Sequence, residues 1–192
     1  MNEAYIGLEK DICNEIRDWS AYALEEKSHH FNGFSPCPYA QKAWEDNRVS
    51  IVFKSSSSYQ PLYDVISQFE DTQDVVLLVD LAYSHSKSFH QKLEQVNEDI
   101  AEGGFTDKDI WVMGFHPEDE PNELIDDGTF DQQVDTLYAM IFVQRLSKLQ
   151  EASQKLAALG YYDGYTGNHS LFEKRTEVYR RLKDGQKAHI SA

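Results

Sequence analysis

The chain of 192 residues has a formal charge of −15, from 18 basic and 33 acidic side chains. A chain this acidic is repelled by nucleic-acid phosphates and by anionic membrane surfaces, which argues against general nucleic-acid binding. No apolar run approaches about 18 residues and the first residues lack the pattern of a signal peptide, so we expect a cytoplasmic protein that does not span a membrane.

Apolar periodicity predicts helices and strands that alternate along the chain. Leu8, Ile12, Ile16, Trp19 and Ala23 follow one another at steps of three or four, which places them on one face of a helix. The predicted elements, in chain order, are a helix over 3–27, a helix over 38–44, a strand over 49–53, a helix over 61–69, a strand over 75–79, a helix over 89–100, a strand over 110–115, a long helix over 134–159 and a helix over 170–184.

This order predicts an α/β (or α+β) fold. We expect a small mixed sheet of three to four strands, covered by helices and flanked by helical N- and C-terminal segments. A hydrophobic content of 41% is enough for one packed core, so residues 1–192 are interpreted as a single domain. Residues 160–192 are expected to form a helical appendage on that core.

Cys37 is the first candidate for chemistry. It lies between Pro36 and Pro38, where a helix is predicted to begin. Backbone N–H groups at a helix start favour a thiolate, which can attack a substrate, be oxidised or bind a metal. The structural alternative is a small residue in a tight turn. The other cysteine, Cys13, belongs to the N-terminal helix and is expected to be a small buried or half-buried residue there.

Three further candidates follow predicted strands. Asp80 ends the strand over 75–79, His85 lies five residues later, and His116 directly follows the strand over 110–115. Ligands of open α/β sheets bind near the carboxyl ends of strands. His116, His85 and Asp80, together with Cys37, are therefore the predicted ligands of a divalent metal, either iron, zinc or manganese.

The same residues allow chemistry without a metal. His116 would then act as a general base oriented by Asp80. The structural alternative is that Asp80 caps the following loop and that His116 packs beside Pro117. An acidic loop over 118–135 is interpreted as solvated, and its position after His116 would also suit a lid. Phosphate-loop, dinucleotide-binding and nucleophile-elbow motifs are absent from the sequence.

Two short motifs resemble those of a bacterial family of similar length that has no assigned activity. That family has Cys-Pro-Phe-Ala after its first helix and Phe-His-Pro after a central strand. The matching residues here are 37–40, with Tyr39 in place of the phenylalanine, and 115–117. The similarity spans roughly residues 8–158. No function transfers with it, but it links Cys37 and His116.

The leading hypothesis is therefore a small enzyme whose catalytic residues are Cys37 and His116. Metal-dependent or thiol-based redox chemistry on a small-molecule substrate is the expected reaction type. The alternative is a non-catalytic interaction protein, for example a homodimer, in which the cysteine and the histidine are structural. The enzyme hypothesis requires Cys37 and His116 within about 10 Å of each other across one pocket.

Overall fold

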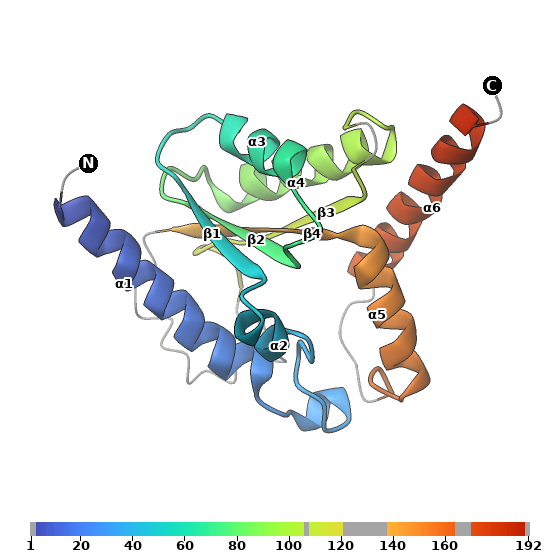
Figure 1. Ribbon diagram of the computed structural model, residues 1–192, viewed down its shortest axis with the longest axis horizontal. Coiled ribbons are helices and arrows are strands. Elements are labelled where there is room, and N and C mark those ends of the chain that lie inside the picture. Colours follow the sequence, from blue (N-terminus) through green and yellow to red (C-terminus); the bar gives the residue numbers. More distant parts are fainter. Residues whose placement is uncertain (1–2, 106–107, 121–137, 164–169, 191–192) are drawn as a thin grey trace.

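The computed structural model describes residues 3–105, 108–120, 138–163 and 170–190 (Figure 1). Its elements, in chain order, are α1 (Glu3–Trp19), the π-helix η1 (Ser20–Glu25), the 3-10 helix η2 (His29–Phe31), α2 (Ala40–Glu45), β1 (Val49–Lys54), α3 (Gln60–Gln68), β2 (Val75–Asp80), α4 (Ser86–Ala101), β3 (Ile110–Phe115), β4 (Ala139–Arg145), α5 (Leu146–Ala158) and α6 (Ser170–Ile190).

Four strands form one mixed sheet in the order β1-β2-β4-β3. β1 and β2 are parallel, and β4 runs antiparallel to both β2 and β3. β1, β2 and β3 therefore point the same way, and their carboxyl ends lie at one end of the sheet. The predicted α/β class, with a small mixed sheet and helical terminal segments, is confirmed.

Helices cover both faces of the sheet (Figure 1). On β2, Val76 and Leu78 pack in the core formed with α3 and α4, whereas Leu77 and Val79 pack in the core formed with α1. A strand that is buried on both faces reads as a continuous apolar run, which explains the sequence of β2. The face that carries Leu77 is the one that holds the candidate site described below.

The C-terminal helix packs at the β3 side of the sheet. Val178 and Leu182 of α6 cluster with Trp111 of β3 and Leu146 of α5. β3 is an edge strand, and a side chain of α4 supplies hydrogen bonds to its free edge. The Asn97 amide donates to the Val112 carbonyl at 2.8 Å and accepts from the Val112 N–H at 2.9 Å. In the part of the chain that the structure describes, no helix combines the length and apolarity that membrane spanning requires.

The long helix predicted over 134–159 is wrong in its first half. Residues Ala139–Arg145 form strand β4, and helix α5 begins only at Leu146. β4 lies between β2 and β3 in the sheet. It pairs with both strands and so provides hydrogen-bond partners for the backbone groups on their facing edges. Phe142, which lies within the predicted helix, belongs to this strand.

Two further predictions shift at their boundaries. The helix predicted over 3–27 is α-helical to Trp19 and continues as the π-helix Ser20–Glu25. The helix predicted to begin at Pro38 begins at Ala40. Most of the predicted acidic loop lies outside the described residues.

Candidate functional site

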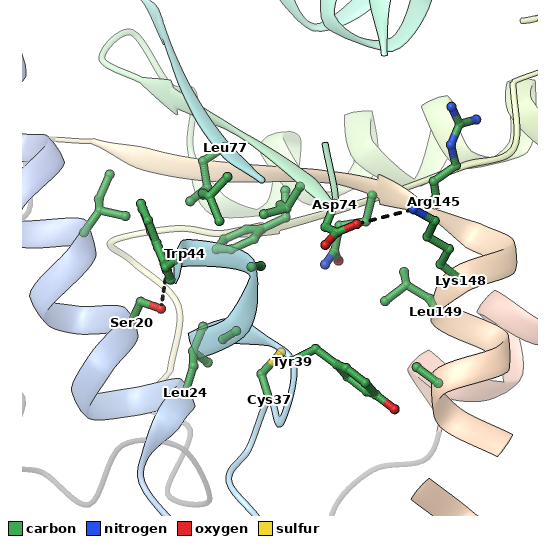
Figure 2. A pocket seen from close by; sticks show the side chains of 18 of the residues that line it. Ser20, Leu24, Cys37, Tyr39, Trp44, Asp74, Leu77, Arg145, Lys148 and Leu149 are labelled. Atoms are coloured by element: carbon green, nitrogen blue, oxygen red, sulfur yellow. Dashed lines mark hydrogen bonds and ion pairs between the residues drawn. The ribbon is translucent and has the colours of Figure 1, made fainter. Parts of the chain in front are cut away.

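An apolar pocket lies on the α1 face of the sheet (Figure 2). Its volume is about 310 Å³. The floor is formed by sheet residues, which include Leu77 and Phe142. One wall comes from η1 and α2, through Leu24 and Trp44, and the opposite wall comes from α5, through Leu149. We call this cavity the Trp44 pocket.

The wall on the α2 side is held in place by a short polar chain. The Trp44 indole N–H donates to Ser20 Oγ at 2.8 Å, and the Ser20 hydroxyl donates to Glu25 at 2.9 Å. Glu25 in turn forms an ion pair with Arg17. Because these partly buried polar groups are hydrogen-bonded to one another, the Trp44 ring can line the pocket without leaving its indole N–H unpaired.

Cys37 lies in the wall of the Trp44 pocket, beside Leu24 and Tyr39 (Figure 2). Its backbone N–H donates to the Leu24 carbonyl at 2.9 Å, which ties the turn to η1. Burial raises the pKa of the thiol, and this outweighs the hydrogen bonds from the Tyr39 and Ala40 amides, which lower it. The predicted amide contacts are therefore present, but their effect is too small to favour a thiolate.

Charged side chains border the pocket on the α5 side. Lys148, Glu151 and Lys155 belong to α5, and Asp74 and Arg145 come from the sheet side. Three of these five residues are basic, in a protein whose formal charge is −15. The pocket is therefore locally richer in positive charge than the protein as a whole.

His116 lies on the other face of the sheet. Its ring contacts Tyr83 and Phe89 at centroid distances of 4.9 and 5.3 Å, and Phe89 belongs to the α3–α4 core. Both ring nitrogens are engaged. Nε2 lies 2.7 Å from the Ser84 carbonyl, and Nδ1 accepts from the Glu118 N–H at 3.0 Å. This pattern defines the Nε2-protonated tautomer and leaves neither nitrogen free as a base.

Asp80 is paired with a lysine that sequence reasoning missed. Lys54 and Asp80 are register partners at the ends of β1 and β2, and their side chains are 1% and 0% exposed. Lys54 Nζ donates to Asp80 Oδ1 at 2.6 Å, and the Ala82 N–H donates to the same oxygen at 2.9 Å. Asp80 Oδ2 is buried without a hydrogen-bond partner among the described residues.

Two acidic residues after β3 tie the chain to the start of α4. Glu118 accepts from the Ser86 N–H at 3.1 Å and lies 3.5 Å from the exposed ring of His85. Asp119 accepts from the Ser86 hydroxyl at 2.7 Å and contacts His90 at 2.9 Å. Burial raises the pKa of Asp119, but these hydrogen bonds and one from a backbone amide together hold it below its usual value.

The structure does not bring Cys37 and His116 together. Cys37 lines the Trp44 pocket on one face of the sheet, and His116 packs on the other. Among the described residues, which include Cys37, Asp80, His85 and His116, no group of three or more His, Cys, Asp or Glu side chains is arranged to hold a metal ion. The predicted metal site therefore has no support in this arrangement.

Residues that sequence reasoning missed make up most of the pocket. The sequence predicts Trp44 and Phe142 as parts of the helices over 38–44 and 134–159, and neither is predicted as a site residue. The sequence does carry a signal for Lys54: the segments 49–54 and 75–80 are mainly apolar and end in residues of opposite charge. Parallel pairing in register places those two charges side by side.

Compared with family models, curated protein sequences and solved structures, the chain matches none of them. The resemblance in the Cys37 and His116 motifs stays a prediction.

Proposed function

We propose that the protein binds a small apolar molecule in the Trp44 pocket. The observation that carries this proposal is a cavity of about 310 Å³ lined mainly by apolar and aromatic side chains. Sites for small ligands span about 300–1,000 Å³ and have such linings, with a few polar groups that orient the ligand. A ligand here would contact the rings of Trp44 and Phe142 and the side chain of Leu149.

The test is titration with N-phenyl-1-naphthylamine, an uncharged dye that fluoresces in apolar surroundings. Ala152 lines the pocket on α5, and Ala157 lies exposed on the same helix. We expect saturable binding to the wild type and to Ala157→Phe, and at least tenfold weaker binding to Ala152→Phe, whose ring would fill the cavity. Equal binding to all three proteins, or none to the wild type, would refute the proposal.

A reaction at the Cys37 thiol is the second candidate, because Cys37 lines the same pocket. This is the thiol part of the enzyme hypothesis with His116 left out. Cys37→Ser would then abolish turnover while dye binding stays unchanged. If Cys37→Ser turned over a bound compound at the wild-type rate, a reaction at the Cys37 thiol would be refuted. The non-catalytic interaction role and the homodimer stay predictions.

A further inference from the structure

The charged side chains that line the Trp44 pocket differ in how closely they are paired with opposite charges. Glu151 accepts from Lys155 at 2.7 Å on α5. Asp74 accepts from Arg48 at 2.8 Å. The Arg48 guanidinium lowers the pKa of Asp74, and this effect outweighs burial, which raises it. Each carboxylate that lines the pocket thus already has a basic partner.

Lys148 is the lining cation with the weakest pairing. Its one hydrogen bond within the described residues is a long contact of 3.4 Å to Asp74 Oδ1, the oxygen that Arg48 already occupies. Its side chain is 50% exposed, so the ammonium can reorient without leaving water. Figure 2 shows Lys148 beside Asp74, at the rim next to Leu149.

Arg145 does not compete for this role. Its guanidinium lies over the ring of Phe69, at 5.3 Å, and pairs with Asp71 at 3.0 Å. Phe69 belongs to the α3–α4 core on the opposite face of the sheet. The charge of Arg145 is therefore directed away from the Trp44 pocket, which leaves Lys148 as the cation available to a ligand.

From this pairing pattern we infer that the ligand of the Trp44 pocket is amphipathic, with an apolar body and one anionic group bound by Lys148. The inference rests on the proposed function, since it describes the ligand of the same pocket. The apolar body would lie on Leu77 and Phe142, and the anion would take the place of Asp74 as the main acceptor of the Lys148 ammonium. Asp74 would remain neutralised by Arg48.

The geometry favours an anion over a cation for a simple reason. A cation at the rim would meet Lys148 and would find both lining carboxylates, Asp74 and Glu151, already paired. An anion would instead gain a charge-assisted hydrogen bond, which is stronger than one between neutral groups. Because the site is half-exposed, this preference should weaken as salt is added.

Two dyes of nearly identical shape test the inference. N-phenyl-1-naphthylamine is uncharged, and 1-anilinonaphthalene-8-sulfonate adds one sulfonate to the same rings. We expect the wild type to bind the sulfonate at least fivefold more tightly than the uncharged dye at low salt. Lys148→Met should remove that difference by weakening the binding of the sulfonate.

Lys174→Met is the matched control, because Lys174 is 60% exposed and pairs with Glu94, away from the pocket. It should keep the preference for the sulfonate. Decanoate should displace the uncharged dye at lower concentration than decanol does, which extends the preference to a carboxylate.

The two possible failures are distinguishable. If neither dye binds, or if Ala152→Phe binds both as the wild type does, the proposed function fails. If both dyes bind in the pocket with equal affinity, or if Lys148→Met changes nothing, the ligand is apolar without an anionic group and only the inference is overturned.

Discussion

The ion pair between Lys54 and Asp80 gives the sharpest stability prediction. With side chains 1% and 0% exposed, neither charge can be solvated if its partner is removed. Lys54→Met keeps the aliphatic stem but leaves the Asp80 carboxylate with one N–H donor, from Ala82, and one oxygen without a partner among the described residues. Removing one member of a buried pair costs about 3–5 kcal/mol.

That cost is a large part of the total stability, which for a domain is about 5–15 kcal/mol. Urea unfolding of wild type, Lys54→Met, Asp80→Val and the double variant measures it. We expect each single variant to lose about 3–5 kcal/mol and the double variant to lose less than either, because no unpaired charge remains. A loss below about 1 kcal/mol in Lys54→Met would refute the account of Asp80 as a structural partner.

Three smaller predictions follow from individual contacts. Because burial raises the pKa of Cys37 above its ordinary value of 9.0, iodoacetamide should alkylate it at pH 8 more slowly than a free thiol, measured in Cys13→Ser; a faster rate would contradict this. The lowered pKa of Asp119 stabilises the fold above about pH 4, and the contribution is lost as the pH falls through the folded-state pKa. Asp119→Asn should therefore flatten the acid limb of the unfolding free energy, and an unchanged slope would count against it. Asn97→Leu removes both hydrogen bonds to Val112 and should cost roughly 1–3 kcal/mol in urea unfolding; a neutral effect would show that water replaces the amide.

The fold can be predicted from the sequence where an apolar pattern fits only one kind of secondary structure. The run 75–79 is apolar throughout and bounded by Asp74 and Asp80, which is typical of a central strand, and it forms most of β2. The run 139–143 is also apolar but continues into the helical pattern of α5, so that its periodicity fits a helix as well as a strand. Only the position between β2 and β3 decides that it forms β4.

The candidate site was harder to predict, because its chemistry depends on burial. The sequence predicts the turn at Cys37 within a few residues of the start of α2, but the pKa of its thiol is set mainly by desolvation, which no local pattern encodes. His116 was placed correctly after β3, but its ring points to the α3–α4 core, away from Cys37. Long-range packing, rather than spacing along the chain, separates these two residues.

The most direct test of the central claim uses the three tryptophans as reporters. Trp44 lines the pocket, as does Trp19, whereas Trp111 is buried in the cluster with α6. In a ¹H–¹⁵N spectrum of the indole groups, titration with the uncharged dye N-phenyl-1-naphthylamine should shift the Trp19 and Trp44 signals saturably and leave Trp111 unchanged. If no indole signal moves, or if all three move alike, the ligand does not occupy the Trp44 pocket and the proposed function is wrong.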